Sequence, residues 1–300
     1  MPKVSPKDIT VCLKRIIFAP KIRLAMADYS VKQIQERILS IMLVIDKVCR
    51  EHNITYYLSD GTMLGAVRHG GFIPWDDDAD MAMPRADYER FIEHGSEWLP
   101  EPYELLCVEK NKKCSGTFLK VIDGSTTLIE RWGLYQLGGV YVDILPLDGV
   151  AKSKWRRKLR FNRFHAVKSL IYLRNRDPYK RGRGYTSWLP RLLQATVSNA
   201  ALQRLLKRIQ TKRTYEDAPL IADFDSGERS VMPREVMGKP TPILFEGHEL
   251  LGVEQPDTYL KYVFGDYMQL PPENKRRIHG FDYVDFNHSY HDYHDTRTFR

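Results

Sequence analysis

Four carboxylates occupy five consecutive positions of this chain, directly after an apolar run. Residues 72–80 read FIPWDDDAD, which brings together Asp76, Asp77, Asp78 and Asp80. Carboxylates at that density repel one another, and two of them on one face do not both ionise comfortably without a cation between them. The chain must therefore fold either with these side chains in water or around a positive charge.

The residues at the end of this cluster have the alternation of a β-strand. Residues 78–83 read DADMAM, and in a strand residues i and i+2 point the same way. Asp78 and Asp80 therefore share one face, while Ala79 turns toward the core. Hard oxygen ligands at this spacing suit Mg²⁺ or Mn²⁺, which keep phosphate oxygens and water as their remaining ligands.

A third carboxylate is predicted in a later strand. Asp143 lies in the run GGVYVDILPLDG, flanked by Val142 and Ile144, and so faces opposite to them. An acid in the middle of an apolar strand is costly unless it is paired or binds a metal. We therefore count Asp143 among the candidate metal ligands, with a buried salt bridge as the alternative. Asp148, beside Gly149, is expected in a turn.

Upstream, the tripeptide Asp60-Gly61-Thr62 stands between a predicted strand at 54–58 and a predicted short helix at 63–69. Asp60 and Thr62 supply N-cap chemistry. Glycine lets a backbone approach a ligand closely, and the amides at a helix N-terminus form a phosphate site. A Gly-Thr turn, an Asp-x-Asp strand and a lone strand aspartate together indicate metal-dependent phosphoryl transfer.

Helical and strand patterns alternate up to about residue 150. Helices are predicted over 31–51 and 87–98, and strands at 54–58, 78–83, 103–108, 117–122, 127–130 and 140–145. This alternation favours an α/β or α+β fold, a mixed sheet with flanking helices. From 155 to about 213 the pattern is helical, with a break at 181–190.

The net charge of +8 is concentrated in one stretch. Residues 152–183 hold thirteen Lys and Arg against the single acid Asp177, a local charge of +12, while the rest of the chain sums to −4. Apolar residues interleave with these cations, as in an amphipathic helix that lies peripherally on an anionic membrane. A helix that packs its apolar face on the domain is the alternative. No recognised nucleic-acid motif accompanies the stretch, so no nucleic acid is expected.

Three ordered blocks of residues resemble a known family. The blocks are GTMLGAVRHGGFIPWDDDADMAMPRADYERF, VYVDILPLDG and, at 259–279, YLKYVFGDYMQLPPENKRRIH. They are similar to the signature blocks of the LicD family, which includes fukutin-related proteins. The resemblance implies a nucleotidyltransferase-like sheet with metal ligands at Asp78, Asp80 and Asp143, and it aligns Asp76 with the leading acid of the family block. Asp60 departs from the family pattern, which has a small residue there.

The resemblance also implies a reaction. LicD-family proteins transfer a phospho-alcohol, such as phosphocholine or a polyol phosphate, from a CDP-linked donor to a glycan hydroxyl. The expected protein is therefore a cytoplasmic transferase, peripheral at the inner face of the membrane. Its acceptor would be a capsule, teichoic acid, lipopolysaccharide or lipid-linked glycan precursor, and CMP would leave. The alternatives are a nucleotidyltransferase that moves an NMP from an NTP, and a basic nucleic-acid-binding protein with a structural acid cluster.

Further side chains are candidates for substrate binding. The Arg68 guanidinium can clamp a phosphate bidentately, and Lys120 faces the site from a predicted strand. Trp75 either walls the pocket, stacks on cytosine or packs in the core. By resemblance, further phosphate contacts come from Lys275, Arg276 and His279. For a choline donor, an aromatic cage is expected around the quaternary ammonium; its candidates are Trp132, Tyr135 and Tyr141.

These expectations divide the chain into four parts. They are an N-terminal basic segment at 1–30, a nucleotidyltransferase-like catalytic core at 31–150, a basic helical region at 151–215 and a C-terminal part at 216–300 that completes the active site. The basic helical region is the part that carries no recognised motif.

Overall fold

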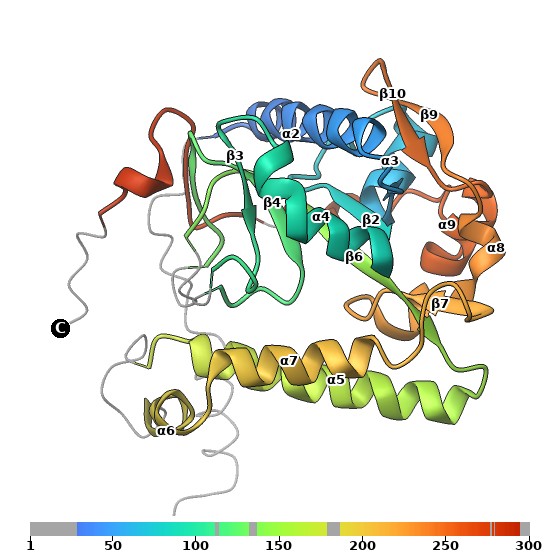
Figure 1. Ribbon diagram of the computed structural model, residues 1–300. Coiled ribbons are helices and arrows are strands. Elements are labelled where there is room, and N and C mark those ends of the chain that lie inside the picture. Colours follow the sequence, from blue (N-terminus) through green and yellow to red (C-terminus); the bar gives the residue numbers. More distant parts are fainter. Residues whose placement is uncertain are drawn as a thin grey trace, which may run out of the picture.

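The computed structural model describes residues 29–111, 114–131, 137–178, 187–276, 278 and 280–294 (Figure 1). In these segments a mixed seven-stranded sheet has the path β1-β2-β6-β4-β3, and β7 and β8 continue from β6. The strands are β1 (Tyr57–Leu58), β2 (Asp80–Pro84), β3 (Tyr103–Leu106), β4 (Leu119–Asp123), β6 (Tyr141–Val150), β7 (Leu220–Ala222) and β8 (Met232–Pro233). Strands β2 and β6 are parallel, and the other pairs are antiparallel. The predicted mixed sheet with flanking helices is confirmed.

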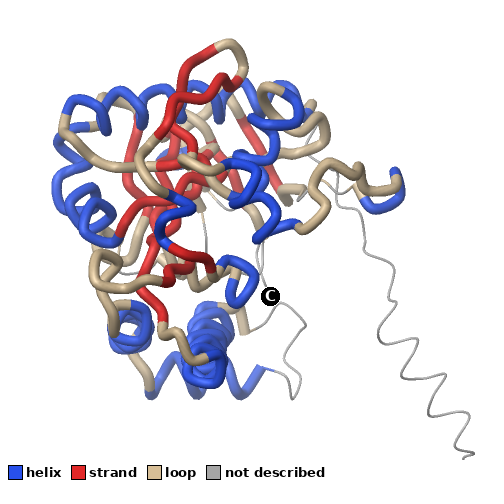
Figure 2. Tube along the Cα trace, turned by 90° about the vertical axis from the view of Figure 1, so that its right-hand side faces the viewer, coloured by secondary structure: helices blue, strands red, loops and turns tan. Residues whose placement is uncertain are grey.

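Two small antiparallel sheets lie beside the main one. One is the hairpin of β9 (Thr241–Phe245) and β10 (His248–Gly252). The other pairs β5 (Thr127–Ile129) with β11 (Tyr283–Asp285). A strand of the C-terminal part thus pairs with the strand that comes directly after β4 in the sequence. Figure 2 shows the strands in the middle of the molecule, with helices around them and a helical layer below.

Helix α2 (Val31–Glu51) confirms the predicted helix residue for residue. Ser30 and Gln33 form a capping box, because the Ser30 hydroxyl accepts from the Gln33 amide at 3.2 Å and the Gln33 carboxamide oxygen accepts from the Ser30 amide at 2.9 Å. The buried face holds Ile34, Ile38, Ile41 and Ile45 among others, and it packs on the central strands β4 and β6.

Strand β6 is longer than predicted. It was expected to end at Leu145, yet it continues through Pro146 to Val150, because its first half lies between β2 and β4 and its second half pairs with β7. The expectation of a turn at Asp148 is therefore wrong. Asp148 is fully buried, and its carboxylate accepts from Arg85 Nε at 2.9 Å and Nη2 at 2.5 Å.

Strand β1 is shorter than predicted. Of residues 54–58, only Tyr57 and Leu58 pair with β2. The Thr55 amide instead donates to the Asp87 carboxylate at 3.1 Å. Its hydrogen-bond acceptor is therefore a side chain and not the backbone of a neighbouring strand. Asp87 belongs to α4 (Arg85–Trp98), which begins two residues earlier than predicted and packs on β2, β3 and β6.

The basic region forms a helical layer below the sheet in Figure 1. Its helices are α5 (Lys154–Asn175), α6 (Trp188–Thr196) and α7 (Asn199–Gln210), with α5 and α7 side by side. Phe161, Phe164 and Ile171 of α5 pack with Leu206 of α7 and with Phe224 in a second apolar core. In the described segments, no helix is long and apolar enough to cross a membrane.

Three further helices pack together. They are α3 (Asp60–His69), α8 (Arg234–Met237) and α9 (Pro256–Phe264), of which α9 contacts both α3 and α8. Helix α3 contacts β2, β9 and α9, so it links the strand that carries the acids to the C-terminal part of the chain. The division of the chain into four parts stays a prediction.

Candidate active site

One row of the sheet brings an acid, a second acid and a lysine together. The register pairs Asp80 of β2 with Asp143 of β6, and Asp143 with Lys120 of β4. Directly paired positions project on the same face of a sheet, so all three side chains point the same way. Lys120 Nζ donates to Asp143 Oδ1 at 2.7 Å. Asp78 was predicted on the same strand, but β2 begins at Asp80, so Asp78 lies in the segment that leads into the strand.

This row lies in a cavity of about 880 Å³ that is lined by charges of both signs. Among the described residues its acids are Asp60, Asp78, Asp80, Glu130, Asp143 and Asp225; its bases are Lys120, Arg131, Lys168, Arg176 and Arg229. Aromatic rings line it as well, namely Phe118, Tyr141, Tyr172 and Phe281. Such a cavity can accept a ligand that combines negative phosphates, a cation and an organic group.

The electrostatics of the cavity oppose a negative charge on Asp80. Burial raises its pKa well above the ordinary value, and the nearby carboxylates of Asp78, Asp60, Asp143 and Asp76 raise it further. For Asp143, burial raises the pKa to about 7, although Lys120 acts in the opposite direction. A divalent cation among these oxygens would remove the mutual repulsion.

Lys120 is a buried cation that three neighbours hold in place. Its Nζ contacts Asp143 and, at 2.9 Å, Glu130 Oε1, and it lies 3.3 Å from the centre of the Tyr141 ring. Burial alone would lower its pKa, but Asp143 and Glu130 outweigh that effect and raise it above the ordinary value. Lys120 therefore stays charged, and it faces the cavity as the sequence predicts.

The turn before α3 does not cap the helix in the predicted way. Ser59 occupies the N-cap position and its side chain makes no cap hydrogen bond. The Thr62 hydroxyl instead accepts from the Asp80 amide at 2.8 Å, which joins the helix to the acid-bearing strand. Expecting N-cap chemistry from Thr62 is thus wrong, because the neighbouring strand takes up its oxygen.

Asp60 is the acid that departs from the family pattern, and it faces the cavity. It adopts a positive φ of 42°, and its amide donates to the Tyr259 hydroxyl at 2.9 Å. Its carboxylate lies 3.8 Å from Arg229 Nη2. Burial raises its pKa, while Arg229 acts against that shift. Asp60 therefore adds an acid to the cavity instead of capping the helix.

Gly61 leaves room for Asp76. A Cβ atom at Gly61 would lie 3.0 Å from Asp76 Oδ2, closer than nearly all real contacts of that kind. Within the described segments Gly61, Thr62 and Asp76 do not line the large cavity. Of the three, Thr62 supports the strand directly, through its hydrogen bond with the Asp80 amide.

The remaining predicted residues lie elsewhere. Arg68 Nη1 donates to the Tyr267 carbonyl at 2.9 Å, and the Arg276 guanidinium lies 4.7 Å from the Trp75 ring centre. Lys275 is exposed. Of the residues described, none of these four lines the acid cavity. The predicted contact of His279 lies outside the described residues, as do Trp132 and Tyr135 of the predicted aromatic cage.

Comparison with known proteins assigns the part of the chain that holds the acid row. Residues 53–168 match the LicD/FKTN/FKRP nucleotidyltransferase domain. The chain carries a LicD-family domain. Over 260 residues it is 28% identical to the lipopolysaccharide cholinephosphotransferase LicD of Haemophilus influenzae. This alignment covers 80% of this chain and 92% of that protein.

Two uncharacterized rickettsial proteins are similar over shorter stretches. The protein from Rickettsia typhi is 49% identical over 41 residues, 14% of this chain and 13% of its own length. The protein from Rickettsia prowazekii is 51% identical over 37 residues, 12% of this chain and 14% of its own length.

Several charges in the cavity come from beyond the LicD-family domain and were not predicted. Arg176, Asp225 and Arg229 all follow residue 168 in the chain. Lys168, the last residue of the match, forms an ion pair with Asp225, to which Thr117 also donates at 3.4 Å. A signal was present in the sequence, since residues 222–227 read ADFDSG and repeat the Asp-x-Asp spacing.

The donor set suits a hard divalent cation. Carboxylate oxygens are the ligands that Mg²⁺ and Mn²⁺ prefer. Asp80, the first residue of β2, and Asp78, which precedes the strand, both line the cavity. The described residues contain no compact group of three or more His, Cys, Asp or Glu with the geometry to hold a metal. Asp143 is engaged by Lys120. Asp78 and Asp80 are therefore the residues that would hold the ion.

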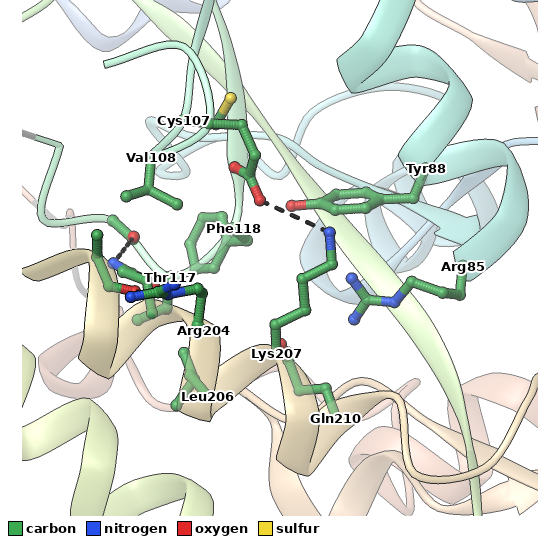
Figure 3. A pocket seen from close by; sticks show the side chains of 14 residues that line it. Arg85, Tyr88, Cys107, Val108, Thr117, Phe118, Arg204, Leu206, Lys207 and Gln210 are labelled. Atoms are coloured by element: carbon green, nitrogen blue, oxygen red, sulfur yellow. Dashed lines mark hydrogen bonds and ion pairs between the residues drawn. The ribbon is translucent and has the colours of Figure 1, made fainter. Parts of the chain in front are cut away.

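Helix α7 supports one wall of the cavity. Gln203 Nε2 donates to the Gly116 carbonyl at 2.8 Å, and Asn199 Nδ2 donates to the Cys114 carbonyl at 2.9 Å. Behind this wall lies a smaller cavity of about 190 Å³, which shares Gly116, Thr117 and Phe118 with the large one. Figure 3 shows Lys207 of α7 extending from the helix toward Tyr88 and Arg85 of α4.

Proposed function

We propose that this protein is a metal-dependent transferase that moves a phospho-alcohol from a CDP-linked donor to a glycan hydroxyl and releases CMP. The alcohol is choline or a polyol, and the acceptor is a cell-surface glycan or its lipid-linked precursor. The observation that carries the proposal is the row of Asp80, Asp143 and Lys120 inside a cavity lined by further acids and bases. The cholinephosphotransferase similar over most of the chain supports phosphocholine and lipopolysaccharide.

The reaction needs positioning and charge neutralisation more than covalent chemistry. Phosphoryl transfer passes through a loose transition state, so an enzyme acts mainly by holding the donor and acceptor in line. A divalent ion held by Asp78 and Asp80 would neutralise the donor diphosphate. The remaining oxygens of the diphosphate would bind to basic residues of the same cavity, namely Lys168, Arg176 and Arg229.

Asp143 is suited to accept the proton of the acceptor hydroxyl. Its pKa of about 7 matches the operating pH of a general base, and Lys120 keeps its carboxylate oriented. The acceptor oxygen forms a bond to the phosphorus next to the alcohol, and the bond from that phosphorus to the CMP oxygen breaks. The hydroxyl proton passes to Asp143.

The aromatic lining favours an organic cation on the donor. The Lys120 ammonium lies 3.3 Å from the centre of the Tyr141 ring, in a cation–π contact. Phe281 packs edge-on against Tyr141, with the ring centres 6.1 Å apart. Quaternary ammonium groups bind to aromatic faces in the same way. We therefore expect CDP-choline to bind more tightly than CDP-ribitol or CDP-glycerol.

A thermal-shift titration tests the proposal. The ligands are CDP-choline, CDP-ribitol, CDP-glycerol, CTP and ATP, each with and without Mg²⁺. Binding should stabilise the protein by about 2.7 kcal/mol at a hundred times the dissociation constant. We expect a Mg²⁺-dependent rise with CDP-choline, lost in the double variant Asp78→Asn, Asp80→Asn and kept in Asp266→Asn, which changes an exposed acid outside the cavity.

Product analysis separates this reaction from nucleotidyl transfer. Release of CMP from the CDP-linked donor would support the proposal, whereas release of pyrophosphate from an NTP would favour a nucleotidyltransferase. A protein that shows no stabilisation with any of the five nucleotides would contradict both reactions and leave the acid row as a structural feature.

A further inference from the structure

A cavity separate from the acid site is lined mainly by cations. It has a volume of about 390 Å³ and lies between the first half of α5 and the C-terminal end of α7. Its cations are Arg156, Arg160, Arg163, Arg208, Lys212 and Arg213, and its other lining residues are Ala151, Leu159 and Ile209. Among the described residues, no acid lines it.

The cavity is built around one anchored arginine. Arg160 Nε donates to the Ile209 carbonyl at 2.6 Å and Nη1 to the Gly149 carbonyl at 2.9 Å, and Nη2 contacts the Gln210 carbonyl. These bonds join α5 to the end of α7 and bring the other cations together. The Arg160 pKa is lowered to about 10, mainly by burial; Asp148 acts against this shift, and Arg213, a cation of the same cavity, contributes to it by repulsion between like charges. A bound anion would relieve that repulsion.

An exposed apolar stripe begins beside this cavity. Along α5, positions 155, 159, 166 and 170 recur at helical spacing, and Trp155, Leu159 and Leu170 are 71%, 38% and 40% exposed. The opposite face of α5 buries its aromatic side chains in the second core. Helix α6, which packs on α5, exposes Trp188 and Leu192 in addition. Tryptophan beside cations is typical of a membrane–water interface.

We propose that the six-cation cavity and the α5 stripe dock the protein on a membrane surface, with the cavity holding the phosphate of an anionic lipid headgroup. Charge complementarity supports this occupant, because residues 152–183 carry a net charge of +12. Trp155 and Leu159 enter the boundary between headgroups and acyl chains, while Arg163 and Lys212 contact phosphates. Leu159 belongs to both features, since it lines the cavity and lies on the stripe.

Docking in this way connects the membrane to the acid site through one helix. The second half of α5 contributes Lys168 and Tyr172 to the large cavity, and Arg176 follows directly after the helix. The first half of α5 lines the six-cation cavity. This part of the inference rests on the proposed function, because a membrane-docked transferase meets an acceptor that is itself linked to lipid.

Vesicle flotation tests the docking directly. Full-length protein is mixed with vesicles of phosphatidylcholine alone or with added phosphatidylglycerol. We expect binding only with phosphatidylglycerol, and a drop of at least about tenfold in the variant Arg163→Glu, Lys212→Glu, since each reversed charge turns attraction into repulsion. The variant Trp155→Ser should bind more weakly than wild type. The control Lys47→Glu, Lys239→Glu makes the same charge change at exposed lysines outside the cavity and should bind like wild type.

Further arms separate the docking from catalysis and from other anions. Asp78→Asn, Asp80→Asn should float like wild type, and Arg163→Glu, Lys212→Glu should keep its stabilisation by CDP-choline.

Equal losses of vesicle binding in the control and the cavity variant, or no flotation at all, would overturn the proposal. Stabilisation by glycerol phosphate without vesicle binding would assign the cavity to a soluble phosphate instead. RNA binding that the cavity variant loses, without vesicle binding, would assign it to nucleic acid.

Discussion

Asp80 is held in an environment that opposes its charge. Burial and the carboxylates of Asp78, Asp60 and Asp143 all raise its pKa. A carboxylate in such surroundings destabilises the folded chain unless a cation binds beside it. The position of Asp80 therefore agrees with the proposed role as a metal ligand better than with a contribution to stability.

The first prediction concerns Asp80→Asn. We expect transferase activity to fall by about a hundredfold or more, as when one preorganised electrostatic group is lost. Without metal, the melting temperature should stay the same or rise, because one of several like charges is removed. Product release and thermal melting of the same preparation check both halves. A variant that melts lower but works normally would mean that Asp80 is structural.

Asp223 gives a prediction for pH. Its pKa is raised from 3.8 to about 7, first by burial and then by Asp60, while its carboxylate accepts from the Ser226 amide at 2.7 Å. A raised carboxyl pKa means that the folded state binds the proton more tightly. The contribution of this group to the free energy of unfolding is therefore greatest below about pH 4. It decreases as the pH rises to about 7, and the protein should remain at this lower stability above that pH.

The substitution Asp223→Asn should remove this dependence. Asparagine keeps the acceptor oxygen for Ser226 but carries no charge. At pH 8 the variant should be more stable than wild type by no more than about 4 kcal/mol, the equivalent of three pKa units. Urea unfolding at pH 5 and pH 8 measures the difference. An unchanged pH slope in the variant would show that Asp223 titrates normally.

At the scale of elements, α7 acts as a support for the acid cavity. It holds the segment before β4 through side-chain bonds to backbone carbonyls, among them the bond from Gln203 to Gly116. That segment supplies Thr117 and Phe118 to the cavity wall. A helix without any recognised motif thus positions residues of the LicD-family domain.

We expect Gln203→Ala to lower kcat/KM about three- to tenfold, because a hydrogen bond of this kind contributes about 1 kcal/mol. The Mg²⁺-dependent binding of nucleotide should be retained. Steady-state kinetics and thermal shifts provide the two readouts. The matched substitution Arg204→Ala removes a side chain whose Nε bonds back to Ala200 of the same helix, and it should leave kcat/KM unchanged. Equal effects of both substitutions would argue against a specific support.

At the scale of the whole molecule, the site depends on residues far apart in the chain. The Asp60 amide is held by Tyr259, 199 residues later, and β6 needs β7 to pair its second half. The second core combines α5 with Leu206 and Phe224. The residues that match the LicD-family domain therefore share strand pairing, hydrogen bonds and an apolar core with later segments of the chain.

A fragment of residues 29–168 should fail to fold cooperatively. It would expose the apolar face of α5 and leave Arg85 and Asp148 without the cover of later residues. Water would then reach part of this ion pair, and the pair would lose the close packing and hydrogen bonds that offset the cost of burying its charges. Circular dichroism with a denaturant titration tests this; a sharp transition like that of the full chain would contradict it.

The local periodicities were enough to predict much of the sheet domain. Helix 31–51 follows from apolar spacing, and the strand predicted at 78–83 from alternation is found at 80–84. The sequence also placed Asp80 and Asp143 on strands and predicted that Lys120 faces a site, whereas its placement of Asp78 on a strand was wrong because β2 begins at Asp80. These inferences work because side-chain direction within one element depends only on the period of that element.

Tertiary structure decided which elements meet, and periodicity holds no information about that. It set Asp143 between Asp80 and Lys120, buried Asp148 against Arg85 and directed the Thr62 hydroxyl to a strand instead of its own helix. It also brought Arg229 and Asp225 to the cavity and left Arg68 and Trp75 outside it. The physical reason is that pairing, burial and charge neutralisation are set by contacts between distant segments. The sequence alone determined the chemistry of the acids and of the basic helix; the fold determined which of those groups act together.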